Sequence, residues 1–202
     1  MDFLQIFTLI TGIAYIVLEI RQKNFMWVVG IATSLAAMWV FFRQGLYASF
    51  GLNTYYFITA FIGLWQWRRN KTAFSETSSV GHDTIVLNRL SWKTVIISAV
   101  VTVIGVVALS WGMDYLHDSG LLAENPMSLL DSAVAVLSAV ATWWLVKSYR
   151  EQWWLWIVAD AMSVALCAMQ GMWWMAVLYV IYIVSAFYGL LHWKKRGVYL
   201  DD

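Results

Sequence analysis

Residues 56–67 read YFITAFIGLWQW, and residues 182–193 read YIVSAFYGLLHW. The two segments share the tyrosine, the Ala-Phe pair, the Gly-Leu pair and the final tryptophan, always 126 positions apart. An ungapped comparison at this offset gives eleven identities in the 43 positions from Trp27 to Arg69. Biased apolar composition gives fewer matches by chance. The sequence therefore predicts an internal repeat, and the repeat sets the fold.

The composition of the 202 residues is that of a membrane protein. Hydrophobic residues make up 61% and charged residues 12%, whereas roughly a quarter of the residues of a soluble domain are charged. A net charge of +1 leaves no basic surface for nucleic acid. The single cysteine, Cys167, excludes an internal disulfide and a cysteine metal site. Fourteen tryptophans are typical of helices with aromatic ends in a bilayer.

Seven apolar runs are long enough to be transmembrane helices, since crossing the hydrocarbon takes about 20 residues. These runs cover Phe3–Leu18, Phe25–Phe42, Leu46–Trp67, Trp92–Leu116, a segment from Pro126 to Val146, Gln152–Gln170 and Met172–Trp193. The long polar segment Arg68–Ser91 is the expected hinge between halves.

The repeat length predicts how the helices are grouped. Three helices and one linking helix return the second copy to the orientation of the first, which makes the repeats parallel. We therefore expect an all-α integral membrane protein of SWEET-like three-one-three type. Its parts are a three-helix bundle at 1–71, a loop and linker helix at 72–126, and a second bundle at 127–202. The pathway is expected between the bundles, along a pseudo-two-fold axis normal to the membrane.

Basic residues predict the orientation. One face of the predicted topology carries only Arg43, whereas the other twelve Lys and Arg lie on the opposite face. Because cytoplasmic loops carry the basic excess, we expect a multi-pass protein of the inner (plasma) membrane. Its N-terminus would be outside and its C-terminus in the cytoplasm. The first run lacks a basic n-region and a cleavage site, so we interpret it as a retained helix and not a signal peptide.

Asp160 is the first candidate for a substrate contact, because an ionisable side chain inside a bilayer usually marks a pathway or a partner. Helical spacing puts Trp153 and Trp156 on its face, and two indoles leading to a carboxylate can hold a flat cation. The alternatives are that both indoles belong to the interfacial belt and that Asp160 bonds a neighbouring helix. The belt is expected to include the residues Trp65, Trp67, Trp143, Trp144 and Trp193.

Four further side chains are candidates for orienting a substrate: Asn53, Tyr56, Tyr179 and Tyr182. Small residues on the same faces, such as Ala60 and Gly63, are better interpreted as helix packing. Asp131 is expected to reach outer water at a helix N-terminus. Glu19 is expected at the cytoplasmic interface.

Several function classes lack their motifs. The chain contains no phosphate-binding G-x-x-x-x-G-K-[ST] loop and no hydrolase motif of the H-E-x-x-H or G-x-S-x-G type. The seventh run has no lysine for a retinal Schiff base, and no two histidines have metal-ligand spacing. We predict no enzymatic activity, no cofactor, no catalytic residue and no metal.

Two groups of motifs resemble the nicotinamide riboside transporter family of PnuC type, over about Leu18 to Lys195. The first half is carried by 24–31 (NFMWVVGI), 46–56 (LYASFGLNTYY) and 63–67 (GLWQW). The second half is carried by 153–160 (WWLWIVAD), with its W-x-x-W motif, 171–173 (GMW) and 189–193 (GLLHW).

The resemblance implies a seven-helix three-one-three fold, facilitated uptake of nicotinamide riboside, and trapping by a separate cytoplasmic kinase. It implies ligand roles for Trp153, Trp156, Asp160, Asn53 and Tyr56. Relatives in the family carry thiamine or riboflavin, and thiamine is also a flat cation, so both alternatives stay open. A vitamin-binding subunit of an ATP-driven importer is a further alternative. The expected partners are the vitamin and the lipid bilayer, and a homo-oligomer is left open.

Overall fold

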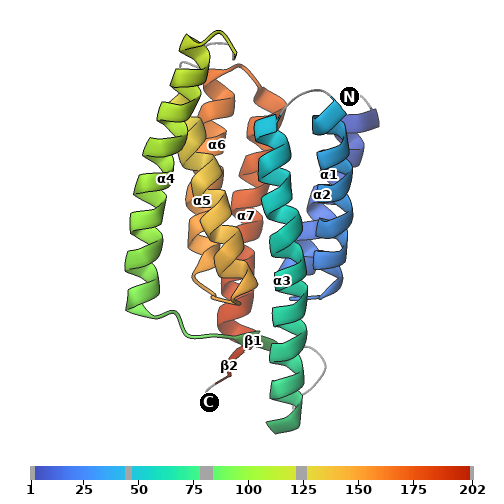
Figure 1. Ribbon diagram of the computed structural model, residues 1–202. Helices are drawn as coiled ribbons and strands as arrows, with labels where there is room; N and C mark the ends of the chain where they lie inside the picture. The colour runs from blue at the N-terminus through green and yellow to red at the C-terminus, as the bar shows by residue number, and fades with distance from the viewer. Residues whose placement is uncertain (1–2, 44–46, 78–83, 122–126, 201–202) are drawn as a thin grey trace. The chain divides into compact units, whose positions relative to one another are not determined.

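The chain is almost entirely helical. The computed structural model describes residues 3–43, 47–77, 84–121 and 127–200, which form seven α-helices and two three-residue strands (Figure 1). The elements are α1 (Phe3–Ile20), α2 (Phe25–Arg43), α3 (Tyr47–Thr77), β1 (Ile85–Leu87), α4 (Trp92–Asp118), α5 (Ser128–Val146), α6 (Gln152–Met169), α7 (Trp173–Arg196) and β2 (Gly197–Tyr199). The predicted all-helical class is confirmed.

Four of the helices, α4 to α7, are long and apolar enough to cross a membrane, within the residues that the structure describes. The most apolar is α4, whose membrane-length window has no buried residue. Its Val and Ile side chains, such as Val103 and Ile104, are 64% and 63% exposed. In water this surface would be unfavourable, since each exposed apolar Å² costs about 25 cal/mol. The chain is therefore a multi-pass membrane protein, and the exposed Val and Ile side chains of α4 are those expected to face lipid.

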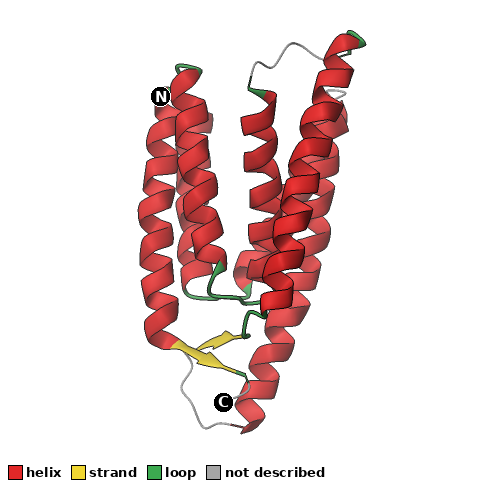
Figure 2. Ribbon diagram, turned by 90° about the vertical axis from the view of Figure 1, so that its left-hand side faces the viewer, coloured by secondary structure: helices red, strands yellow, loops and turns green. Residues whose placement is uncertain are grey.

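The segment expected to be a loop after Trp67 is partly structured. Helix α3 continues for ten residues to Thr77, because this stretch contains no glycine or proline. The hydroxyl of Thr72 also bonds the carbonyl of Arg68 (3.0 Å). Beyond it, β1 pairs in parallel with β2, which puts Val86 opposite Val198. Both strands lie beyond the end of α7 (Figure 2). The sequence analysis did not predict this small sheet.

Contacts divide the chain into two units. The first unit comprises residues 1–88, 143–150 and 191–202, and the second comprises residues 89–142 and 151–190. Thus α5 and α7 each begin in the second unit and end in the first. In Figure 1, α1 begins at the top of the first unit, and the strands β1 and β2 lie at its lower end. We call this lower end the basic end, since the turns there carry Arg21, Lys23, Lys147 and Arg150.

Two matching turns lie at the basic end of the first unit. Gln22 follows α1 with φ 48°, and Ser148 follows α5, 126 residues later, with φ 56°. Each turn closes its helix with two backbone bonds, one donated by the positive-φ residue itself and one by the residue after it. Lys23 N–H bonds Leu18 O (2.9 Å), and its counterpart Tyr149 N–H bonds Trp144 O (3.0 Å). Glycine adopts a positive φ most easily, but this chain has a glutamine and a serine at the two positions.

The tryptophan predictions need correction. Trp67, Trp144 and Trp193 were expected in the interfacial belt, but they are 1%, 6% and 0% exposed. The first unit buries them because their rings pack on one another and on helix ends. The Trp27 and Trp67 centroids are 5.1 Å apart, and those of Trp67 and Trp193 are 6.4 Å apart.

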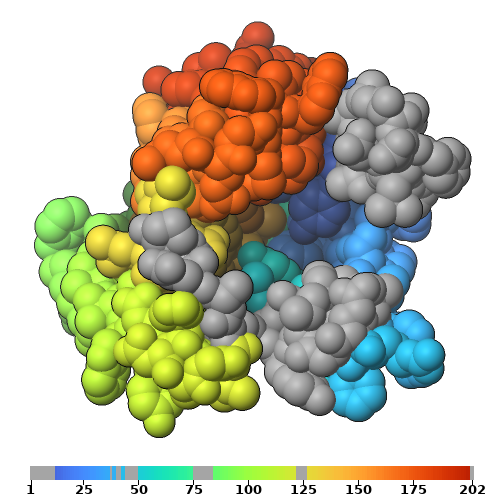
Figure 3. Space-filling model, turned by 90° about the horizontal axis from the view of Figure 1, so that it is seen from above, coloured from blue at the N-terminus to red at the C-terminus, as the bar shows by residue number. Residues whose placement is uncertain are grey.

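Other tryptophans are exposed, as expected of residues facing lipid or its interface. Trp65 is 59% and Trp143 is 38% exposed. In the second unit, Trp173 and Trp174 at the start of α7 are 67% and 72% exposed. In Figure 3, the region where α6 ends and α7 begins (orange) forms a bulky open surface.

Candidate functional site

The second unit brings a buried carboxylate and two phenols together. Asp160, in the middle of α6, is 7% exposed, and Ser163 one turn later is 3% exposed. Tyr179 on α7 lies near enough to interact with Asp160 and Ser163, and Tyr182 also interacts with Asp160. The two tyrosine rings meet edge to face at 5.9 Å. Three predicted site residues thus lie together, around a carboxylate that water scarcely reaches.

The chemistry of this cluster suits a cation with hydroxyl groups. A carboxylate removed from water binds a positive charge strongly, while phenols can donate or accept hydrogen bonds. No lysine or arginine occurs in the second unit after Lys93. Asp160 therefore has no basic side chain along α6 or the second-unit part of α7 to neutralise it.

Trp153 and Trp156 have different surroundings. Trp153 is 2% exposed, and a Cβ added to Gly189 would lie 2.6 Å from its ring. Its ring therefore fills the space left by the glycine on α7. Trp156 is half-buried, and its indole N–H is buried without a hydrogen-bond partner in the part of the chain that the structure describes. The Trp156 indole N–H is therefore a donor that a ligand could use.

Asn53 and Tyr56 belong to the first unit, on α3, where both are half-buried. Tyr56 interacts with Tyr15 of α1, which also interacts with Glu19 one turn further on. The edge of the Tyr15 ring lies 3.8 Å from the Cβ position of Gly30. A second polar cluster, Tyr15, Glu19 and Tyr56, is thus formed within this unit.

Tyr15 and Glu19 were not among the predicted site residues. Glu19 was expected at an interface beside charged residues, but it is 4% exposed. The four-residue spacing that puts Tyr15 and Glu19 on one face of α1 was the available signal. Nothing in that spacing says that α3 covers this face.

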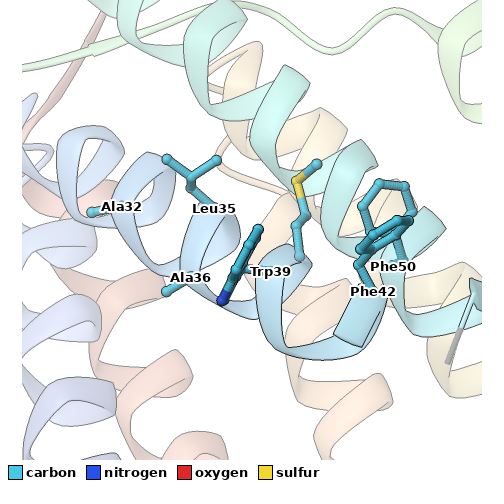
Figure 4. Close-up of a pocket in the computed structure, with 7 residues that line it drawn as sticks. Ala32, Leu35, Ala36, Trp39, Phe42 and Phe50 are labelled. Atoms are coloured by element: carbon cyan, nitrogen blue, oxygen red, sulfur yellow. The ribbon is translucent and has the colours of Figure 1, made fainter. Parts of the chain in front are cut away.

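The first unit also contains an apolar groove. Its volume is about 710 Å³. Figure 4 shows Trp39 beside it, with the rings of Phe42 and Phe50 close together at one end; their centroids are 6.0 Å apart and their planes are tilted by 53°. The lining residues are Ala32, Leu35, Ala36, Met38, Trp39, Phe42 and Phe50. Without a polar side chain, this groove is suited to hydrocarbon and not to a charged vitamin.

Metal binding finds no support in the described residues, which contain no group of three or more His, Cys, Asp or Glu side chains able to hold an ion. Asp131 is half-buried in the first turn of α5, where a negative charge is favourable.

Comparisons with known proteins identify the family. The profile described as "Nicotinamide mononucleotide transporter" matches residues 2–195. The nicotinamide riboside transporter PnuC of Neisseria mucosa is 26% identical over 197 residues, covering 92% of this chain and 70% of its own length. PnuC of Escherichia coli is 28% identical over 176 residues, covering 78% and 72%.

A solved structure has a similar fold. The crystal structure of the vitamin B3 transporter PnuC superposes with a TM-score of 0.64 and 24% identity, covering 93% of this chain and 79% of that one. The resemblance seen in the sequence motifs is confirmed: the chain belongs to the nicotinamide mononucleotide transporter family, whose members include the PnuC transporters.

Proposed function

We propose that this chain carries nicotinamide riboside across the membrane by facilitated diffusion. The observation that carries the proposal is the buried carboxylate of Asp160 beside Tyr179 and Tyr182. The family consists of transporters, so the prediction that the chain is not an enzyme is confirmed. The relatives are named for nicotinamide riboside, which favours this vitamin over thiamine.

Charge separates nicotinamide riboside from the mononucleotide in the family's description. The riboside is a cation, whereas the mononucleotide adds a phosphate that needs basic partners. From Asn24 to Trp67 the only basic residue is Arg43, and from Gln152 to Trp193 there is none. A phosphate would therefore enter the spans without a cation, while the pyridinium ring would meet Asp160. The same charge argument disfavours neutral riboflavin.

We propose distinct roles for the seven predicted residues. The Trp156 indole lies one turn before Asp160 and would stack on the pyridinium ring. Asp160 would pair with the ring's charge, and Tyr179 and Tyr182 would bond the ribose hydroxyls. Asn53 and Tyr56 remain candidates for an amide and a phenol contact with the substrate. Trp153, packed on Gly189, would support the face on which Trp156 lies.

We infer a parallel three-one-three arrangement with bundles at 1–71 and 127–202 and a loop with a linker helix at 72–126. The recurrence of helix limits supports it: α1, α2 and α3 begin at 3, 25 and 47, and α5, α6 and α7 begin at 128, 152 and 173. These starts differ by 125 to 127 positions, as their subtraction shows. The basic end would face the cytoplasm, because in the predicted topology twelve of the thirteen basic residues lie on the same side of the membrane as its turns.

Purified protein in liposomes that contain no other protein tests the proposal. We expect uptake of labelled nicotinamide riboside, saturable and independent of ATP, with excess unlabelled riboside competing and the mononucleotide and riboflavin competing poorly. Binding should also raise the apparent melting temperature, because a ligand of the folded form stabilises it. Uptake only with an added ATPase would favour the importer-subunit alternative. A rise in melting temperature with thiamine and not with nicotinamide riboside would make thiamine the substrate. Because facilitated diffusion does not concentrate its substrate, net uptake in cells would require a cytoplasmic kinase that traps the vitamin.

A further inference from the structure

The residues that close the basic end of the first unit include two pairs of repeat equivalents. Gln22 and Ser148 are 126 positions apart, and so are Trp67 and Trp193. We call these four residues the inner lock. Gln22 Nε2 donates to Ser148 Oγ at 3.4 Å, and the Trp67 and Trp193 ring centroids are 6.4 Å apart. All four side chains are at most 1% exposed.

The two indoles make crossed hydrogen bonds. Trp67 Nε1 donates to the carbonyl of Leu145 (3.1 Å), and Trp193 Nε1 donates to the carbonyl of Ile20 (2.9 Å). Both acceptors belong to the last turn of a helix, where carbonyls lack helical partners. Thus α3 is joined to the end of α5, and α7 is joined to the end of α1. Each bond therefore joins a helix of one repeat to the end of a helix of the other repeat.

A contact between repeat equivalents has a geometric meaning. Two residues related by a two-fold axis touch only when both lie beside that axis. The proposed pathway follows the same axis, so fully buried side chains at this level block it. The inner lock is therefore in the position of a plug at the basic end.

The strands extend the same connection. The Gln22 amide bonds both backbone groups of Val86, accepting from its N–H (2.9 Å) and donating to its carbonyl (2.8 Å). β1 is in turn paired with β2, and Asn88 Nδ2 donates to the carbonyl of Lys147 (2.7 Å). The segment between the repeats, the C-terminal strand and both turns are thus held by hydrogen bonds around the lock.

The backbone at the lock is one that side chains rarely adopt. Gln22 and Ser148 both have positive φ, which costs energy for residues other than glycine. Such conformations persist where surrounding contacts fix them, and they cluster at switch regions. Here the contacts that fix Gln22 are those with Val86 and Ser148.

We propose that the inner lock is the closed inner gate of the transport path, and that release of substrate requires both indole–carbonyl bonds and the Gln22–Ser148 bond to break. The inference rests on the proposed function. It places the gate at the basic end and assigns it to two pairs of equivalent residues, Gln22 with Ser148 and Trp67 with Trp193.

Thiol labelling tests the gate without any substrate. Ser148→Cys in a Cys167→Ala background gives one cysteine, buried by the lock. Replacing Trp67 and Trp193 together by phenylalanine removes both indole donors and keeps aromatic rings. We expect a water-soluble maleimide to label position 148 at least fivefold faster in this variant. The matched control replaces Trp65 and Trp174, exposed residues on the same two helices. Equal labelling rates in the two variants would overturn the inference.

A reversible cross-link provides the second test, for the case in which the double phenylalanine variant misfolds. Gln22→Cys with Ser148→Cys, again without Cys167, is joined by a short reducible thiol cross-linker. Cross-linking should lower nicotinamide riboside flux by more than tenfold, while the riboside still raises the melting temperature of the protein. Cleaving the cross-link with a reducing agent should restore the flux. Unchanged flux in cross-linked protein would overturn the gate. If the wild-type chain neither binds nor transports the riboside while labelling responds as expected, the proposed function fails and the lock stands.

Discussion

The two repeats are alike in packing and different in polarity. Trp27 lies against Gly63 as Trp153 lies against Gly189, with an added Cβ 2.5 Å and 2.6 Å from the respective rings. The positions of the polar groups do not correspond. Asp160 has Ser34 as its equivalent, and Tyr179 has Asn53.

This difference separates scaffold from site. Helix packing imposes the same requirement on both repeats, so the tryptophan and glycine pair is kept in each. One substrate molecule beside a two-fold axis is not itself symmetric, and its charge needs a partner on one side only. Positions that pack should therefore respond alike to substitution in both repeats, and positions that bind substrate should not.

The largest effect is expected at Asp160, the buried carboxylate whose equivalent in the first repeat is the uncharged Ser34. Asp160→Asn keeps the shape of the side chain and removes its charge, whereas Ser34→Ala removes only a hydroxyl from the matching position. Losing a charged contact costs about 1.5 to 3 kcal/mol, which is about 10- to 100-fold in uptake below the KM. We expect that loss for Asp160→Asn in liposomes and less than a twofold change for Ser34→Ala. Comparable losses in both variants would mean that the two positions serve the scaffold.

The sequence predicted the helices well because their signal is local. Runs of apolar residues bounded by charges predicted every helix to within a few residues except the far end of α3, which continues to Thr77. The sheet was missed because β1 and β2 are three residues each and pair across more than a hundred positions. No periodicity in so short a segment indicates a partner.

The site was predicted less completely, for a different reason. Spacing along one helix groups side chains by face, as for Trp153 and Asp160, which are both buried. It does not indicate which helix covers that face. Trp67 and Trp193 have the composition and position of belt residues, and only the three-dimensional packing shows that they are buried. The burial of Glu19 likewise could not be predicted from its position in the sequence.

An intermediate effect is expected where the repeats are alike. Gly63→Ala and Gly189→Ala each put a methyl group against a buried indole that cannot easily move, and such overpacking costs about 1 to 3 kcal/mol. Both apparent melting temperatures in detergent should fall by about 2 to 12 °C. Gly51→Ala is the control, since no atom lies within 4 Å of its added Cβ and alanine favours a helix. A fall at only one of the two equivalent positions would contradict the shared scaffold.

The smallest effect concerns a residue that only the first repeat possesses. Lys71 is half-buried on the part of α3 beyond the membrane span, where it donates to the carbonyl of Gln22. Burial, and to a lesser degree the charge of Lys23, lower the pKa of Lys71 below its ordinary value, which is about 10.4.

Between the lowered pKa and 10.4 the unfolded chain binds more protons at this position, so the free energy of unfolding contributed by Lys71 rises with pH in that window. Lys71→Met should lose this rise, changing the difference in apparent melting temperature between pH 8 and pH 10.5 by about 2 °C. Lys194→Met, at an exposed position on α7, should retain the wild-type difference, because all other titrating groups are common to both variants. The same pH dependence in the two variants would mean that burial of the Lys71 ammonium does not affect stability. The contact between Lys71 and Gln22 would then not help to hold the turn after α1 against α3.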